Sequence, residues 1–443
     1  MSEFETRYKN LNANQKKAVD TIEGPVMVVA GPGTGKTELL SMRVANILKR
    51  TDALAQNILC LTFTESGASA MRERLAGLIG SDAYKVAIHT FHSFGTEIIN
   101  HYGEFFYQGA HFRAADELSS YEILAPILEK LPHASPIGGK MNGTFTHLHD
   151  IQFAISNMKK SGLTPDEVGM ILDRNDAFIA WVKPRLLSAF SDRLSKKSLV
   201  SIQGLLDEIE NYQEDPLTLV GYLPLHETLS ATLRSALESS HNQNSTKPMS
   251  AWKRTYIEKN ASGDPTLKDE KRATKLRATL GVYYEYLVTM QSKSLYDFDD
   301  MILRVVHGME VFSELRLNLQ EQYQYVLVDE FQDTNPLQWQ ILRSWLEAYG
   351  QAKDRPTVFI VGDPKQSIYR FRRADPRLFT SAKAFLQSEM QAIGIDQDVT
   401  RRNAPKINQA VNHTFERLFN FYSFEAVFDW YIEKDKIWSF LAK

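Results

Sequence analysis

Four short apolar runs along the chain share one pattern, in which glycine or polar residues follow the run and a helical repeat comes next. The runs are VMVVA (26–30), ILCLTF (58–63), YVLV (325–328) and TVFIV (357–361). Continuous apolar runs are typical of buried parallel strands, and strands that alternate with helices form an α/β fold. Ligands bind at the carboxyl ends of parallel strands, so the polar residues after these runs predict one composite site.

The long segment between His92 and Asp297 has a different pattern. Helical periodicity prevails there and is interrupted by polar stretches, which predicts a large helical insertion within the α/β domain. The charged, polar part from Lys247 to Arg277 fits a grip on duplex DNA, a docking surface for a partner subunit, or a solvated face. A solvated face is the simplest of these interpretations.

Composition narrows the class of protein. The 443 residues carry a formal net charge of −3 and are 43% hydrophobic, which fits a globular protein of more than one domain. The polar N-terminus and the lack of a long apolar run predict a soluble, cytoplasmic protein with no membrane span. The single cysteine, Cys60, excludes an internal disulfide and predicts a buried small side chain. Local basic tracks at 370–373 and 401–402 leave nucleic-acid binding open.

The stretch AGPGTGKT (30–37) predicts a phosphate-binding loop, with Ala30 where the pattern has its first glycine. Backbone N–H groups of such a loop, and the N-terminus of the helix after it, face phosphate oxygens. Lys36 would meet the β- and γ-phosphates of ATP, and the Thr37 hydroxyl would ligate Mg²⁺. An ordinary glycine turn is the alternative, but the strand before the loop and the helical repeat after it favour a nucleotide site.

Two adjacent carboxylates, Asp329 and Glu330, follow the third apolar run. Asp329 is suited to hold a metal ion, and Glu330 is suited to act as a base for the attacking water. Carboxylates at an exposed strand end are common without a function, but this pair complements the phosphate-binding loop. A base at Glu330 favours hydrolysis over transfer to a second substrate, so the sequence predicts an ATPase rather than a P-loop kinase.

The order of motifs resembles the UvrD/Rep-like superfamily 1 DNA helicases, which include RecB-like and AddA-like recombination helicases. LNANQKKAV (11–19) is similar to the Q motif, the phosphate-binding loop to motif I, and VLVDEFQDTN (326–335) to motif II. Further resemblances are LTFTESGASAMRERL to motif Ia, IHTFHSF to motif Ib, IVGDPKQSIYRFRRAD to motif III and TRRNAPKINQAVN to motif IV. ISNMKKSGLTPDEV (155–168) resembles part of the family's subdomain 1B, and YYEYLVTMQSKSLYDFDDMIL (283–303) resembles the helix leading back into 1A.

The resemblance implies roles around ATP. Gln15 would read the adenine, Gln366 would sense the γ-phosphate, and Arg402 would touch that phosphate from a second motor domain. Taken alone, Arg402 would be interpreted as a surface salt bridge. The implied cofactor-binding residues are Gln15, Gly33, Thr34, Gly35, Lys36 and Thr37, with Thr37 and Asp329 for Mg²⁺ and with Glu330, Lys36, Gln366 and Arg402 as catalytic residues.

The same resemblance implies a track for single-stranded DNA, where bases stack on aromatic faces beside a basic groove. Phe63 aligns with a motif Ia aromatic residue, and Phe371 stands where the family has the stacking tryptophan of motif III. Taken singly, each aromatic residue is equally well explained by packing in the core, and His92 by packing beside Phe91. The implied DNA-binding residues are Phe63, Thr90, His92, Tyr369, Phe371 and Arg372.

Residues 1–97 and 283–393 are expected to form a RecA-like subdomain 1A, and residues 98–282 the helical subdomain 1B. Residues 394–443 are expected to begin a second RecA-like domain, 2A, and to be truncated, because motifs V and VI do not appear in the sequence.

The implied function is ATP-dependent 3'-to-5' translocation on single-stranded DNA and at single/double-strand junctions. Its setting would be DNA repair or recombination, with a protein partner from those processes. A catalytically incomplete, nucleotide-gated single-strand-binding module and an RNA-directed ATPase are the alternatives.

Overall fold

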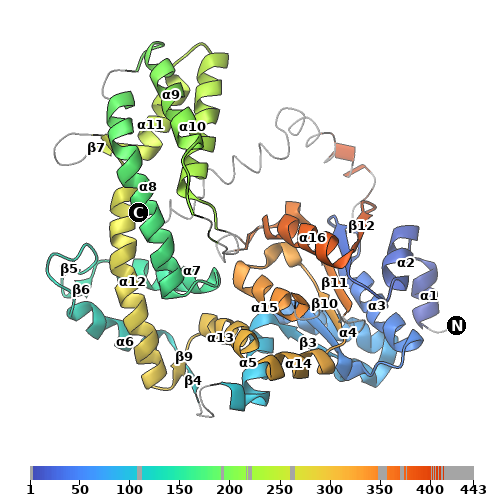
Figure 1. Ribbon diagram of the computed structural model, residues 1–443. Coiled ribbons are helices and arrows are strands. Elements are labelled where there is room, and N and C mark those ends of the chain that lie inside the picture. Colours follow the sequence, from blue (N-terminus) through green and yellow to red (C-terminus); the bar gives the residue numbers. More distant parts are fainter. Residues whose placement is uncertain are drawn as a thin grey trace. The chain divides into compact units, whose positions relative to one another are not determined.

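The chain divides into two compact units, which we call the sheet unit and the helical unit. The described residues of the sheet unit lie within 3–116, 159–162 and 291–413, and those of the helical unit lie within 117–158 and 163–290. Figure 1 shows the computed structural model with both units. The residues it describes are 3–106, 112–190, 194–215, 217, 222–259, 265–347, 357–369, 374–375, 377–400, 402, 404, 406–407, 409–410 and 413.

The sheet unit is built on a six-stranded sheet in the order β12-β1-β11-β10-β2-β3. Every neighbouring pair is parallel, with β1 flanked by β11 and β12. This confirms the predicted α/β class, and the four predicted apolar runs are four of its strands. The strands are β1 (Val26–Ala30), β2 (Ile58–Thr62), β3 (Ala87–Thr90), β10 (Tyr325–Val328), β11 (Thr357–Gly362) and β12 (Ile393–Gln397).

The central strands are apolar without interruption because both faces of the sheet are covered. All five residues of β2 and all six of β11 are buried. One face packs with α3 and its neighbours around Val28, Cys60 and Val361. Cys60 is a fully buried free thiol, as predicted. The apolar core on this face therefore supports the strands whose loops carry the predicted site residues.

Helices alternate with strands along the sheet unit and lie beside the sheet (Figure 1). Among them, α13 packs against α5 and α15, and the rings of Phe94 and Trp345 stack at 6.1 Å between α5 and α15. These helices are α1 (Glu3–Lys9), α2 (Ala13–Asp20), α3 (Lys36–Arg50), α4 (Glu65–Ile79), α5 (Phe91–His101), α13 (Phe298–Val311), α14 (Ser313–Gln322), α15 (Pro336–Glu347) and α16 (Arg377–Met390). Short 3-10 turns add η1 (Ala55–Asn57), η2 (Gly80–Tyr84), η3 (Gly103–Phe105), η5 (Phe331–Asp333) and η6 (Pro364–Gln366), and β4 (Arg113–Ala114) pairs with β9 (Leu295–Tyr296).

Two segments join the sheet unit from unexpected places in the sequence. Strand β12 pairs with β1 in the sheet, although the sequence expects a new domain from residue 394. Residues 159–162, which resemble part of subdomain 1B, cluster with the sheet unit instead of the helical unit. Both placements depend on contacts distant in sequence, and the subdomain bounds drawn from the resemblance stay a prediction.

The helical unit has its own core. Helices α8 to α11 meet around Phe178, Leu206, Leu233 and Trp252. The elements are α6 (Glu117–Glu129), α7 (Leu148–Lys160, whose last two residues lie in the sheet unit), α8 (Pro165–Phe190), α9 (Ser198–Glu210), α10 (Leu225–Asn242), α11 (Lys247–Tyr256) and α12 (Lys268–Ser292), with hairpins β5 (Lys140–Met141)–β6 (Thr144–Phe145) and β7 (Ile257–Lys259)–β8 (Pro265–Leu267). No helix in the described part of the chain is long and apolar enough to cross a membrane.

Candidate nucleotide site and nucleic-acid face

The parallel sheet brings the predicted site residues to one edge. Because all six strands run in the same direction, the loops after β1, β10, β11, β2 and β3 leave from the same side of the sheet. The phosphate-binding loop follows β1, and the two carboxylates follow β10. The candidate γ-phosphate sensor follows β11, while the candidate DNA contacts follow β2, β3 and β11. Sequence order alone places none of these loops beside another.

The phosphate-binding loop is shaped by glycines in the left-handed region. Gly33 has φ 76°, and Gly35, the N-cap of α3, has φ 88°. Within the loop, Thr34 Oγ1 donates to Gly31 O at 2.8 Å. A side chain at Gly33 would collide with Thr400 Oγ1 and with Arg402 Cβ, the latter at 2.6 Å. Arg402, predicted to meet the γ-phosphate, therefore lies against this loop.

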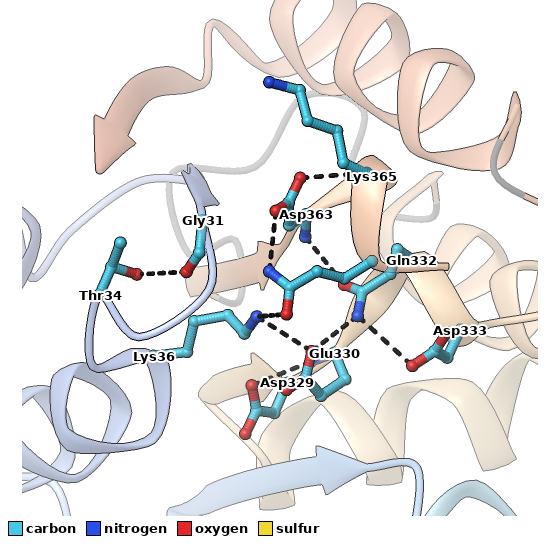
Figure 2. A network of polar contacts seen from close by, with 10 residues as sticks. Gly31, Thr34, Lys36, Asp329, Glu330, Gln332, Asp333, Asp363 and Lys365 are labelled. Carbon is cyan, nitrogen blue, oxygen red and sulfur yellow. Dashed lines mark hydrogen bonds and ion pairs between the residues drawn. The ribbon is translucent and has the colours of Figure 1, made fainter. Parts of the chain in front are cut away.

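Lys36 is the first residue of α3 and the centre of the site (Figure 2). Its Nζ lies 3.3 Å from Glu330 Oε2 and donates to Gln366 Oε1 at 3.1 Å. The Lys36 side chain is 8% exposed, whereas that of Glu330 is 36% exposed. Three residues predicted from separate motifs thus meet at one ammonium group, and one of its partners stays in contact with solvent.

Asp329 and Glu330 differ sharply although they are adjacent. Asp329 is 6% exposed, and its burial, together with the charge of Glu330, raises the pKa of Asp329 to about 7. Glu330 adopts the left-handed conformation with φ 49°, unusual for a residue with a Cβ, and its N–H donates to Asp329 Oδ1 at 2.9 Å. The left-handed turn directs the chain into η5, so the two carboxylates occupy different surroundings.

The donor set at this edge suits Mg²⁺. Magnesium prefers hard oxygen ligands and is commonly held by one or two carboxylates together with substrate phosphates. Asp329 offers a buried carboxylate whose charge a divalent cation would stabilise, and Thr37 offers a hydroxyl on the first turn of α3. Within the described residues, no cluster of three or more His, Cys, Asp or Glu side chains is arranged around a metal position.

Three further polar residues belong to the site and were not predicted: Gln332, Asp333 and Asp363. Gln332 Nε2 donates to Glu330 Oε2 at 2.6 Å, and Gln332 Oε1 accepts the N–H of Asp363 at 2.9 Å (Figure 2). Asp363 Oδ2 in turn accepts Gln366 Nε2 at 2.7 Å. Burial, followed by the charge of Glu330, raises the pKa of Asp333 to about 7. The apolar strand before each of these residues was the available signal, since polar residues just past such strands lie at the site edge.

Gln15 contacts the phosphate-binding loop from α2. Its Nε2 donates to Thr34 O at 2.9 Å, and its Oε1 accepts the N–H of Asn12 at 3.0 Å in a capping box. The side chain is buried, with the residue 4% exposed. In this structure Gln15 fastens the start of α2 to the loop, so adenine recognition by Gln15 stays a prediction.

An aromatic pair occupies the part of the edge after β2 and β11. The rings of Phe63 and Tyr369 lie 4.8 Å apart with their planes tilted by 35°. Both side chains are partly exposed. The structure therefore brings together two of the predicted stacking residues. Phe371 and Arg372, predicted to contact DNA, lie outside the described residues.

Thr90 and His92 follow β3. Thr90 is 7% exposed, and its Oγ1 caps α5 by accepting the Ser93 N–H at 3.1 Å and donates to Glu65 Oε1 at 2.9 Å. Burial, and then Lys160, lowers the pKa of His92, whose ring meets Phe298 edge-on at 6.3 Å. Phe298, at the start of α13, is 64% exposed and was not predicted. A direct DNA contact by Thr90 would compete with its capping role.

The fold and the site together define an α/β nucleotide-binding domain with a phosphate-binding loop. Sequence comparison is more specific: the UvrD/REP helicase N-terminal domain matches residues 11–387. The chain belongs to this family.

Individual relatives are distant in sequence. An ATP-dependent DNA helicase PcrA from Staphylococcus epidermidis is 24% identical over 413 residues, which cover 92% of this chain and 41% of the relative. A protein of the same name from Leuconostoc citreum is 22% identical over 416 residues, covering 94% and 40%. A third, from Staphylococcus aureus, is 24% identical over 368 residues, covering 83% and 35%. The chain thus spans about two fifths of the length of the curated relatives it matches.

Proposed function

We propose that this chain supplies the ATP-binding and hydrolysing part of a DNA helicase. The motor would translocate 3' to 5' on single-stranded DNA and act at single/double-strand junctions. Its relatives are named ATP-dependent DNA helicases, which supports the substrate class. A cytoplasmic setting, a role in DNA repair or recombination, a protein partner from those processes, and the 1A, 1B and 2A subdomain bounds belong to the same proposal.

One observation carries the proposal: Lys36 lies between Glu330 and Gln366, within 3.3 Å and 3.1 Å. A phosphate arriving at Lys36 would compete for the ammonium group that now holds both side chains. The proposed base and the proposed sensor would therefore respond to the same event. An ordinary glycine turn would not explain this convergence of three motifs.

The roles of the residues follow from their positions. The N–H groups of the loop and of the first turn of α3 would bind the phosphates, and Lys36 would neutralise developing charge. Glu330, partly exposed, would accept a proton from the attacking water, while Arg402 lies against the loop at Gly33. Thr37 and Asp329 would hold Mg²⁺, which when bound neutralises charge on the phosphate oxygens.

The nucleic-acid end of the proposal is supported by continuity of the chain. Tyr369 is three residues past Gln366, and it contacts Phe63, the residue after β2. The partly exposed pair offers aromatic faces at the same sheet edge as the phosphate-binding loop, together with His92 after β3 and with Phe298, which the His92 ring meets edge-on. Each stacked base contributes roughly 1–3 kcal/mol and requires no particular sequence. Motion of the sensor loop would thus reach a stacking surface directly.

The test is ATP hydrolysis by this chain with and without single-stranded DNA, with RNA of the same sequence and with the Glu330→Gln variant. We expect stimulation by DNA above that by RNA. We also expect Glu330→Gln to bind a fluorescent ATP analogue with unchanged affinity and to lose hydrolysis. Nucleotide and strand binding without stimulated hydrolysis would favour the nucleotide-gated binding module instead. Normal turnover in Glu330→Gln would remove the base assignment.

A further inference from the structure

We propose that Gln332 is a positioning residue that holds Glu330 and joins it to the loop 363–369, which carries Gln366 and Tyr369. The inference rests on the proposed function and deepens it, because it assigns the link between hydrolysis and the DNA face. Neither the roles implied by the motifs nor the names of the relatives assign a function to Gln332. The link is made by the side-chain amide of Gln332, which uses both its donor and its acceptor.

The donor side of the amide holds the proposed base. Gln332 Nε2 donates to Glu330 Oε2 at 2.6 Å and to Asp333 Oδ2 at 3.3 Å. Gln332 is 2% exposed, so these hydrogen bonds lie out of competition with bulk water. Glu330 itself is partly exposed, and the other contact of its carboxylate is the longer one to Lys36 Nζ at 3.3 Å, which a phosphate could displace. The amide fixes the direction from which that carboxylate meets the site.

The acceptor side of the same residue holds the loop after β11. Gln332 Oε1 accepts the Asp363 N–H at 2.9 Å, and the backbone oxygen of Gln332 accepts Ser367 Oγ at 3.1 Å. Strand β11 approaches closely because Gly362 has no side chain: a Cβ there would lie 2.6 Å from Gln332 Oε1. The base and the sensor loop are therefore tied to one rigidly packed amide.

Competition for Lys36 shows why this link matters. In the structure, Lys36 also connects the two sides, since it contacts both Glu330 and Gln366. A phosphate that takes over the Lys36 ammonium would break that connection. The Gln332 amide bonds to Glu330 and Asp333, which follow β10, and to Asp363, which follows β11, and these hydrogen bonds would survive the exchange. It would then carry the connection between Glu330 and the loop 363–369 while nucleotide is bound.

The experiment compares Gln332→Met with Gln320→Met in the full chain. Methionine has nearly the length of glutamine and lacks its donor and acceptor. Gln320 is a matched control, since it is 3% exposed and donates to the backbone oxygen of Trp345 at 2.8 Å, away from the site. The readouts are kcat, KM, affinity for a fluorescent ATP analogue, and single-strand affinity with and without a non-hydrolysable ATP analogue.

For Gln332→Met we expect kcat to fall roughly 10- to 100-fold, by analogy with the loss seen when a partner that orients a metal ligand is removed. KM and analogue affinity should stay within about 3-fold, because the Gln332 amide bonds to Glu330, Asp333 and Asp363 (Figure 2) and none of these lies on the phosphate-binding loop. The effect of the ATP analogue on single-strand affinity should disappear. Gln320→Met should keep the wild-type kcat and the wild-type nucleotide effect.

Two outcomes would overturn the inference. One is a wild-type kcat and nucleotide effect in Gln332→Met, and the other is an equal loss in Gln332→Met and Gln320→Met, which would mean general destabilisation. If Gln332→Met does not fold, Gln332→Glu replaces it, since a carboxylate keeps the acceptor for Asp363 and loses the donor to Glu330. That variant should lose kcat and keep the nucleotide effect, and a wild-type kcat would overturn the inference. Failure of the proposed function appears in the wild-type chain itself, as absent hydrolysis or strand binding, and would overturn both.

Discussion

Two lysines of the sheet unit each meet two side-chain partners, but in opposite ways. Lys159 is fully buried, and its Nζ lies 2.6 Å from Asp297 Oδ2 and 2.6 Å from Asp300 Oδ1 at the start of α13. Lys36 has longer contacts, 3.3 Å to a partly exposed carboxylate and 3.1 Å to a neutral amide. Lys159 is thus held by two carboxylates, whereas Lys36 has one carboxylate and one amide that a ligand could replace at low cost.

The difference shows that the contacts of a buried lysine decide whether it stabilises the fold or is available to bind a ligand. A buried charge is costly unless close partners compensate it, and two carboxylates at hydrogen-bonding distance compensate Lys159 fully. The pair also fastens residues 159–162 to the sheet unit. Lys36 is compensated loosely, so phosphate oxygens can replace its partners without breaking tight ion pairs.

The largest expected effect is on stability and follows from Lys159→Met. Removing one partner of a buried ion pair leaves uncompensated charge and costs about 3–5 kcal/mol. Asp297 and Asp300 would both lose their counter-charge. Urea unfolding measures the loss, with Lys160→Met as control, because Lys160 is 29% exposed and lies 3.7 Å from Asp299. Similar unfolding midpoints for the two variants would erase the contrast between the two lysines.

Next in size is the loss of activity in Lys36→Met. Removing a charged donor aimed at developing phosphate charge should lower ATP turnover by at least roughly 100-fold. The unfolding free energy should change by less than about 1 kcal/mol, because Glu330 is 36% exposed and stays hydrated. Lys49→Met, on the same helix with a side chain 53% exposed, serves as control. A large loss of stability in Lys36→Met would place it with Lys159.

A smaller difference in stability is expected between variants of the carboxylate partners, Asp300 beside Lys159 and Glu330 beside Lys36. Asp300→Asn should cost about 1–2 kcal/mol of stability, because Lys159 loses one ion pair and keeps Asp297. The cost is limited because burial raises the pKa of Asp300, so the neutral amide removes a carboxylate that the fold disfavours in its charged form. Glu330→Gln should leave the melting temperature within about 1 °C of wild type. Thermal unfolding of both variants makes the comparison, and equal shifts would contradict it.

The smallest expected effect is a gain of stability in Asp333→Asn. Burial and the charge of Glu330 raise the pKa of Asp333 to about 7, above its ordinary value of 3.8. The folded state therefore favours the protonated form, and the penalty for the charged form grows as pH rises from about 4 to 7. At pH 8 without nucleotide, Asp333→Asn should melt roughly 1–3 °C higher than wild type. The advantage should vanish at pH 4, and a gain independent of pH would point away from titration.

Local patterns predict the phosphate-binding loop and the paired carboxylates well. Lys36 could be predicted because a strand, a glycine turn and a helix follow one another within a few residues. Glu330 could be predicted because the carboxylate pair directly follows a strand. In both cases the local sequence determines where the side chain lies. Four of the six strands of the sheet and its α/β class were confirmed for the same reason, whereas β3 and β12 were not predicted as strands of this sheet. Roles of Gly33, Gly35 and the other site residues in binding ATP stay predictions.

Contacts between distant segments could not be read in this way. Gln332 meets Asp363 because β10 and β11 are neighbours in the sheet, and no sequence period encodes that adjacency. Lys159 is buried by residues far along the chain, and its sequence context resembles a different subdomain. Thr90 is a milder case, since its capping box with Ser93 is a local pattern that sequence reasoning could have weighed against DNA contact.

The order of strands in the sheet also determines when the protein can fold during its synthesis. Strand β1 ends at Ala30, but its two neighbours begin at Thr357 and Ile393. Ribosomes add roughly 5–20 residues per second, so β1 waits on the order of tens of seconds with both edges unpaired. Contacts of the helical unit between residues 163 and 290 are complete much earlier. The apolar strand β1 therefore stays without its neighbouring strands during most of synthesis, while residues 163–290 have time to fold first.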